Sequence, residues 1–166
     1  MLGVISDTHD NLRAVDKFVE IFKEKEIREI LHLGDFISPF TLKKFQNFKL
    51  YGIFGNNDGE KLMLKDVANS LEFLLEEPPF ELELWGKKFL LLHGYGSRER
   101  TRRIVDTFAK SEEYDFILYG HTHQVDIRRI GSTFILNPGE ACGYLFGKNT
   151  AAILDPENYR VKILHL

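Results

Sequence analysis

Cysteine is almost absent from this sequence of 166 residues, and Cys142 is its only copy. A single cysteine excludes an intramolecular disulfide framework and a zinc module built on several cysteines. No apolar run approaches the roughly 18–20 residues that a membrane-spanning helix needs. The segment from Met1 to Asp7 also lacks the basic start of a signal peptide. These absences predict a cytoplasmic protein with no membrane partner.

An excess of basic charge is lacking as well. The chain has 22 Lys and Arg residues against 25 Asp and Glu residues, which gives a formal net charge of −3. This balance argues against a dedicated nucleic-acid-binding surface, because such surfaces are strongly basic. The hydrophobic share of 43% is ordinary for a globular protein and excludes intrinsic disorder. The length predicts one domain over residues 1–166 and leaves homo-oligomerisation open.

Hydrophobic periodicity predicts strands that alternate with helices in the first half of the chain and mostly strands in the second. The predicted strands of the first half span residues 2–5, 29–33 and 50–54, and its helices span about 11–25, a segment from Pro39, and about 60–75. The second half is predicted as a hairpin over 80–92, a helix over about 98–110, and strands at 116–119, 125–130, 133–136, 151–154 and 159–164. This order predicts an α/β fold in which two sheets pack face to face with helices outside.

Side chains that bind metals follow several of the predicted strands, at the point where each strand ends. They are Asp7, His9, Asp35, Asn56, His93, His121 and His123. In α/β proteins, ligands bind beyond the carboxyl ends of the strands, so we expect these side chains to meet in one small volume. Residues two apart on extended backbone point the same way. Each Asp-x-His or His-x-His pair can therefore address one site.

Histidine and carboxylate ligands without a thiolate are typical of sites for Mn²⁺, Fe²⁺, Zn²⁺, Ni²⁺ or Co²⁺. A set of seven exceeds what one such ion takes and suits two ions that share a carboxylate. Two ions about 3.5–4 Å apart can bind phosphate oxygens, lower the pKa of a bridging water and stabilise in-line displacement at phosphorus. With both aspartates and a bridging hydroxide, such a centre keeps roughly one positive charge, which attracts an anionic substrate.

Five short motifs resemble those of the calcineurin-like binuclear metallophosphoesterases and occur in that family's order. They are Asp7-Thr8-His9, Gly34-Asp35, Gly55-Asn56-Asn57-Asp58, His93-Gly94 and Gly120-His121-Thr122-His123. The short chain and the segment Asn137-Pro138-Gly139 are similar to the small bacterial and archaeal branch typified by the YfcE phosphodiesterase. The resemblance implies a four-layer α/β/β/α sandwich of two mixed sheets flanked by helices.

The resemblance also implies a division of labour within the site. Asp7, His9 and His123 would hold one metal ion. Asn56, His93 and His121 would hold the other, and Asp35 would bridge the two. The implied activity is hydrolysis of small phosphodiesters by a metal-bridging hydroxide, with Asp35, Asn56 and His93 as catalytic residues. The implied cofactors are two divalent transition-metal ions, Mn²⁺ ahead of Ni²⁺, Fe²⁺, Zn²⁺ or Co²⁺.

Two positions depart from the family pattern. Many members carry a histidine after the motif asparagine and another after the His-Gly pair, whereas this chain has Asn57 and Tyr95 there. Asn57 cannot act as a general acid, so we expect modest rates and a preference for good leaving groups. The further candidates for contact with the metal ligands or the substrate are Asn57, Asp58, Tyr95 and Asn137.

Simpler roles fit several other polar residues. His32 lies between two leucines of a predicted strand and is expected in the core. The arginines between residues 98 and 103 fit a solvated helix face better than a guide for an anionic substrate. Cys142 is not needed by the predicted metal site.

Two other functions remain compatible with these residues. A non-catalytic scaffold of the same fold, like the retromer subunit that resembles this family, would act through protein contacts and lose metal ligands. All seven expected ligands are present here, which favours an enzyme, whereas Asn57 favours the scaffold. A hydrolase with a single zinc ion would leave several of the expected ligands unused.

Overall fold

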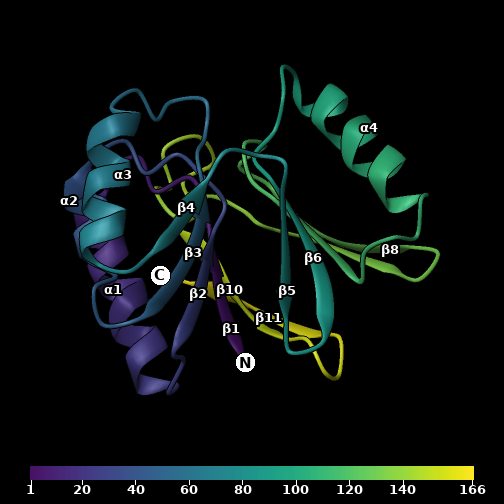
Figure 1. The fold of residues 1–166 in the computed structure, drawn as a ribbon, viewed down its shortest axis with the longest axis horizontal. Helices are drawn as coiled ribbons and strands as arrows, with labels where there is room; N and C mark the ends of the chain where they lie inside the picture. The colour runs from purple at the N-terminus through teal and green to yellow at the C-terminus, as the bar shows by residue number, and fades with distance from the viewer.

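The computed structural model describes residues 1–166 and consists of two β-sheets with helices on their outer faces (Figure 1). Its first half contains β1 (Leu2–Ile5), α1 (Leu12–Glu24), β2 (Glu29–His32), α2 (Pro39–Lys43), β3 (Lys49–Ile53), α3 (Lys61–Ser70) and β4 (Leu74–Glu76). Its second half contains β5 (Phe80–Leu84), β6 (Lys87–Leu92), α4 (Arg98–Ala109), β7 (Phe116–Tyr119), β8 (Val125–Ile130), β9 (Thr133–Pro138), β10 (Thr150–Asp155) and β11 (Arg160–His165). None of the helices is long and apolar enough to cross a membrane.

Both sheets are mixed. The first has the strand order β11-β10-β1-β2-β3-β4, and β1 to β4 run parallel while β10 and β11 join antiparallel. The second has the order β5-β6-β7-β9-β8, with β6, β7 and β9 parallel and the outer strands antiparallel. Two mixed sheets with flanking helices confirm the predicted fold class.

Three apolar clusters lie between the layers and explain why the layers hold together. Leu31 of β2 packs with Phe89 and Phe116 of the second sheet in the cluster between the two sheets. Its neighbour Ile30 points the other way and packs with Phe18 of α1. A third cluster joins α4 to β6, β7 and β9. Helices α1, α2 and α3 cover one outer face and α4 covers the other, so the layers are α/β/β/α (Figure 1).

The prediction of one helix over about residues 60–75 was wrong in its second part. Helix α3 ends at Ser70, and Glu72 turns the chain with φ 57° while the N–H of Phe73 donates to the carbonyl of Ala68. Residues 74–76 then pair with β3 as the parallel edge strand β4. The apolar residues of this stretch fit helical spacing, but pairing with the open edge of β3 buries Leu75 completely. Periodicity alone does not separate these outcomes over a short run.

The carboxyl ends of the central strands of both sheets meet at one end of the sandwich, and polar contacts tie them together. Nδ1 of His93, after β6, lies 2.6 Å from the carbonyl of Leu33, after β2. The backbone N–H of His121, after β7, donates to Oδ2 of Asp7, after β1, at 3.1 Å. The loops that follow these strands therefore share one space.

Candidate metal centre

The structure brings the seven side chains expected from the sequence into one cluster at this end of the sandwich. Four of them follow strands of the first sheet: Asp7, His9, Asp35 and Asn56. Three follow strands of the second sheet: His93, His121 and His123. The cluster therefore lies across the junction of the two sheets.

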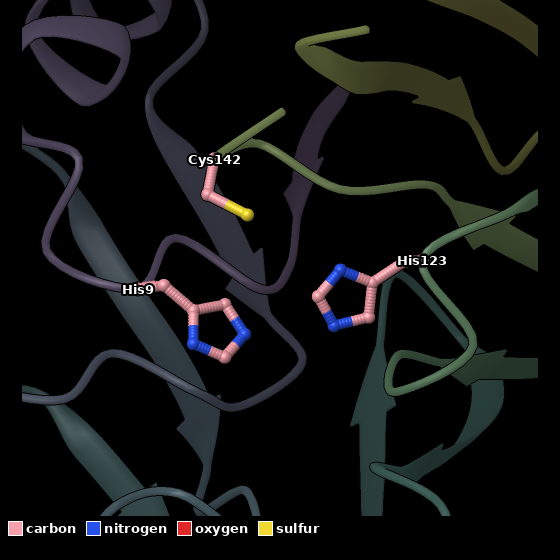
Figure 2. A group of neighbouring side chains, drawn as sticks. All are labelled: His9, His123 and Cys142. Carbon is pink, nitrogen blue, oxygen red and sulfur yellow. The ribbon is translucent and has the colours of Figure 1, made fainter. Parts of the chain in front are cut away.

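One part of the cluster is formed by Asp7, His9, Asp35 and His123, whose ligand atoms all lie within 4.8 Å of one another. Oδ1 of Asp7 lies 3.2 Å from Nε2 of His123 and 3.9 Å from Nε2 of His9. Figure 2 shows the rings of His9 and His123 side by side, and their centroids are 5.2 Å apart. These atoms converge as the ligands of one metal ion must.

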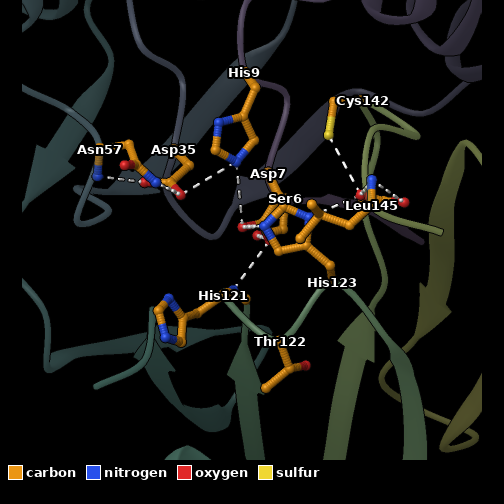
Figure 3. Close-up of polar contacts among 12 residues, drawn as sticks. Ser6, Asp7, His9, Asp35, Asn57, His121, Thr122, His123, Cys142 and Leu145 are labelled. Atoms are coloured by element: carbon orange, nitrogen blue, oxygen red, sulfur yellow. Dashed lines mark hydrogen bonds and ion pairs between the residues drawn. The ribbon is translucent and has the colours of Figure 1, made fainter. Parts of the chain in front are cut away.

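The other part is formed by Asn56, His93 and His121. Oδ1 of Asn56 lies 3.1 Å from Nε2 of His93 and 2.8 Å from Nδ1 of His121. The carboxylate of Asp35 stands between the two parts. Its Oδ2 is 3.3 Å from Nε2 of His9 and 3.4 Å from Nε2 of His93 (Figure 3 shows the contact with His9).

Two atoms of the cluster are buried without a hydrogen-bond partner, namely Oδ1 of Asp7 and Nε2 of His9. The other carboxylate oxygen of Asp7 is occupied, because it accepts from the Ser6 hydroxyl and from the N–H of His121. A buried polar atom without a partner costs about 1–3 kcal/mol. The two atoms lie 3.9 Å apart and have only the ion-pair contacts given above, so a divalent cation between them would satisfy both. The residues therefore fit a site for a borderline transition metal.

Electrostatics pairs Asp35 with His93 in the absence of a cation. Burial raises the pKa of Asp35, but hydrogen bonds and charge from His93 and hydrogen bonds from Asn57 hold it well below its usual range. Burial lowers the pKa of His93, but the hydrogen bond to Asp35 and the charges of Asp7 and Asp35 outweigh it and raise the pKa to about 9. Near neutral pH, Asp35 is therefore ionised and His93 protonated. A metal ion at Nε2 of His93 would have to displace that proton.

Five of the seven side chains stand on backbone in the left-handed region, which non-glycine residues rarely adopt. The φ angles are 52° at Asp7, 42° at His9, 59° at Asp35, 65° at His121 and 60° at His123. Such angles persist only where the surrounding structure enforces them, and they gather at functional sites. This strain could not be predicted from the sequence, because aspartate and histidine do not mark left-handed positions as strongly as glycine does.

Asp58 holds the backbone beside Asp35, and Asn57 holds the carboxylate of Asp35. The buried carboxylate of Asp58 accepts backbone N–H groups from Gly55 at 2.7 Å, Ile37 at 2.7 Å and Asp35 at 3.0 Å. It thereby ties the loops after β2 and β3 together. Asn57 donates its backbone N–H and its Nδ2 to the two oxygens of Asp35 (Figure 3).

Asn137 and Tyr95, the other candidates from the sequence, lie outside the cluster of ligand atoms. Nδ2 of Asn137 donates to the carbonyl of Gly120 at 2.9 Å and to Oγ1 of Thr122 at 3.0 Å, so it supports the loop that carries His121 and His123. Tyr95 is 65% exposed, and its ring lies under the guanidinium of Arg100.

His32 is fully buried, as expected for a core residue, and its ring stacks on Phe36. Its Nδ1 accepts the N–H of Gly34, and its Nε2 lies 3.1 Å from Oγ1 of Thr8. Burial lowers the pKa of His32 well below its ordinary value, so the ring is neutral. It supports the backbone beside Asp35 without joining the ligand set.

Sequence reasoning missed Cys142 and Glu140, which come from the loop after β9. The N–H of Cys142 donates to the carbonyl of Asp7 at 3.0 Å, and this places the thiol beside His9 and His123 (Figure 2). Burial raises the pKa of Cys142 to about 12. The buried carboxylate of Glu140 lies 2.8 Å from Nδ1 of His123. No local pattern marks either residue, because Cys142 is placed by the segment after β1 and Glu140 by the loop after β7.

Two pockets adjoin the cluster, one lined in part by His93 and the other by His123. A pocket of about 300 Å³ beside His93 is mainly apolar, with walls from Leu92, Ile104 and Phe108. A pocket of about 550 Å³ beside His123 includes the basic side chains of Arg102 and Lys148. No acidic side chain lines either pocket. An anion with one apolar substituent would match these surroundings.

Comparisons with known proteins agree with the geometry. Residues 1–159 match the family model of the calcineurin-like phosphoesterase superfamily domain. The chain is 36% identical over 168 aligned residues to Phosphodiesterase MJ0936 of Methanocaldococcus jannaschii, with 98% of each chain covered. A solved archaeal phosphodiesterase superposes with a TM-score of 0.90 at 34% identity over 99% of each chain. The Escherichia coli phosphoesterase YfcE has a TM-score of 0.67 at 18% identity, covers 98% of this chain and 97% of its own, and shares the fold.

Proposed function

The chain belongs to the calcineurin-like phosphoesterase superfamily, and from this membership we propose that it is a phosphodiesterase that holds two divalent metal ions. The carrying observation is the position of Asp35, whose Oδ2 lies within 3.4 Å of a histidine nitrogen in each part of the cluster. One carboxylate shared between two groups of ligands is what a pair of neighbouring ions requires.

In this proposal, Asp7, His9 and His123 hold one ion. Asn56, His93 and His121 hold the other, and Asp35 contacts both. When bound, the ions supply the positive charge that binds phosphate oxygens and activates a water for attack on phosphorus. Mn²⁺ is the proposed principal ion, and Ni²⁺, Fe²⁺, Zn²⁺ and Co²⁺ share its preference for histidine and carboxylate ligands.

The residues of the chain bind and orient the substrate and control protons. Asp35 stays ionised because His93 and Asn57 stabilise its charge, so it is ready to bind cations near neutral pH. Arg102 and Lys148 line the pocket beside His123, so Arg102, although exposed as a solvated helix face requires, would attract an anionic substrate together with Lys148. Asn57 donates to Asp35 and has no acidic proton to give, so a leaving group must depart largely without help.

The proposed substrates are small phosphodiesters with good leaving groups, and residues 1–166 form the one domain that acts on them. The pockets beside the cluster, of about 300 and 550 Å³, have room for a small molecule. The seven converging ligand side chains favour an enzyme over a protein scaffold of the same fold, as do Oδ1 of Asp7 and Nε2 of His9, which are buried without a hydrogen bond.

Metal reconstitution tests the proposal. The purified chain would be stripped with a chelator and reloaded with each candidate ion, with Mg²⁺ as a control that prefers oxygen ligands. Metal content and hydrolysis of bis(p-nitrophenyl) phosphate and p-nitrophenyl phosphate would be measured. We expect two ions per chain, no hydrolysis by the stripped protein, and faster hydrolysis of the diester. Asp35→Asn should lose both metal and activity. A single ion at saturation, or activity that survives stripping, would contradict the proposal.

A further inference from the structure

Glu140 is a buried carboxylate in the loop after β9, and it has several polar contacts. Its side chain accepts the N–H of Leu145 at 3.0 Å and the N–H of Phe146 at 2.6 Å. Its Oε2 also lies 2.8 Å from Nδ1 of His123 and 3.5 Å from the thiol of Cys142. Glu140 itself is 1% exposed. It therefore joins the loop after β9 to one of the proposed metal ligands.

The ring of His123 lies between two carboxylates that face its two nitrogens. Nδ1 faces Glu140, whereas Nε2 lies 3.2 Å from Oδ1 of Asp7. A neutral imidazole carries its proton on one nitrogen and offers a lone pair on the other. With a metal ion at Nε2, shared with Oδ1 of Asp7, the proton of the neutral ring would be on Nδ1, where the carboxylate of Glu140 accepts it. Metal-binding histidines commonly have such a partner on the second nitrogen.

We propose that Glu140 is a positioning residue, which fixes the tautomer and the ring orientation of His123 so that Nε2 is presented to a metal ion. The Glu140 carboxylate accepts two backbone N–H groups and lies 2.8 Å from Nδ1 of His123, so each of these three partners can donate to it. The two backbone N–H groups hold that carboxylate in place, and it holds the ring in turn. The inference rests on the proposed metal centre and adds a residue that none of the family motifs contains.

The protonation state of His123 in the wild-type chain tests the inference directly. Proteins labelled with ¹⁵N at histidine would be loaded with Zn²⁺, which is diamagnetic, and long-range ¹H–¹⁵N spectra would be recorded. The signals of His123 would be assigned by their absence from the His123→Gln variant. We expect a proton on Nδ1 and a metal-shifted Nε2. The reverse assignment would overturn the inference, and this result requires no variant of Glu140.

Metal affinity gives the second measurement, by titration of Zn²⁺ and Mn²⁺ into chelator-treated protein. Glu140→Gln keeps the size and polarity of the side chain but removes its charge, and we expect affinity to fall about 10–100-fold. Asp115→Asn is the matched control. Asp115 also accepts a backbone N–H, from Lys88, but it precedes β7 and so lies at the far end from the cluster. This control should stay within about twofold of wild type.

The outcomes separate this inference from the proposed function. Equal losses in Glu140→Gln and Asp115→Asn, or no loss in either, would overturn the role of Glu140. If the wild-type chain binds metal and hydrolyses the diester in those cases, the proposed function survives and only the inference fails. A wild-type chain that binds no divalent ion would refute both.

Discussion

Asn57 donates a hydrogen bond to each of the two carboxylate oxygens of Asp35. The backbone N–H of Asn57 donates to Oδ1 and its Nδ2 donates to Oδ2, each at 2.8 Å. Sequence comparison with the family motif presents Asn57 only as a missing histidine. The structure gives it a role of its own, because these two hydrogen bonds orient the carboxylate that stands between the two halves of the cluster and help keep it ionised.

Replacing Asn57 with histidine should change which leaving groups the enzyme tolerates. An imidazole can protonate an alkoxide, so alkyl esters should gain relative to activated aryl esters. The gain in rate should stay below the ~10²–10⁴-fold that a well-placed general acid contributes, because no residue of this loop positions the new imidazole. Asn57→Ala is the control, since it loses the Nδ2 donor without adding an acid. The measurement is kcat/KM of both variants for a series of diesters whose leaving groups differ in pKa. If the kcat/KM of Asn57→His divided by that of Asn57→Ala stays constant across the series, the histidine does not protonate the leaving group.

Gly55→Ala should inactivate the enzyme although it adds only one methyl group. A Cβ at this position would overlap the side chain and backbone N of Asp35. Gly59 lies in the same loop, and a Cβ there would meet nothing within 4 Å. We expect Gly55→Ala to lower kcat/KM and metal affinity at least about tenfold, with Gly59→Ala close to wild type. Comparable activities of the two variants would show that this close approach does not fix Asp35.

Metal binding should release a proton from His93 near neutral pH. The pKa of His93 is raised to about 9 without a cation, so the ring is protonated at pH 7 and must become neutral to coordinate a metal. Calorimetric titration in buffers of different ionisation enthalpy should detect release of about one proton per chain from this residue. The release should diminish, and affinity should stop rising, above about pH 9. If His93→Asn releases as many protons as wild type, another group is their source.

Cys142 should resist alkylation in the folded protein. Its thiol is 2% exposed, and burial raises its pKa to about 12. Since the thiolate is the reactive form, labelling by iodoacetamide at pH 8 with chelator should be roughly a thousandfold slower than in urea. Mass spectrometry would follow the modification. Native protein that stays unlabelled after exposure to iodoacetamide should keep the hydrolytic activity of untreated protein. Rapid labelling of the native chain would show that the loop after β9 opens readily.

The left-handed backbone at His121 should make glycine more stabilising than alanine there. Both substitutions remove the imidazole, but only alanine keeps a Cβ at φ 65°. In chelator, His121→Gly should be more resistant to urea than His121→Ala by about 1 kcal/mol. At Asp66, exposed on α3, the order should reverse because glycine weakens a helix. The same order at both positions would show that no strain is relieved at His121.

The sequence predicted the seven converging side chains because one rule sufficed for them. Each follows a strand directly, and parallel strands end at the same edge of a sheet. Glu140 and Cys142 also follow a strand, β9, that is parallel to β7, but the rule does not say which side chains of the long loop after it turn toward the cluster. The loop that carries them depends on backbone contacts with Ser6 and Asp7, more than a hundred residues earlier in the chain. No local pattern reports a contact over such a distance.

Strand β4 was not predicted from the sequence for a different reason. Its residues have apolar spacing that a helix also accepts, and only the open edge of β3 decides between the two. The backbone angles at Asp7, Asp35 and His123 likewise follow from the loops that enclose them. Local pattern therefore predicted which side chains meet, whereas tertiary contacts determine how those side chains are held.

The division of the cluster between the two sheets has a consequence for how the chain matures. Each proposed ion takes ligands from both sheets, with His123 completing the group of Asp7 and His9, and Asn56 completing the group of His93 and His121. Neither sheet offers a complete set by itself. The binding energy of metal is therefore available only after the two sheets have packed together. Metal would stabilise the folded state but would not direct the folding of either sheet. A nascent chain must reach residue 123 before it can retain its metal ions.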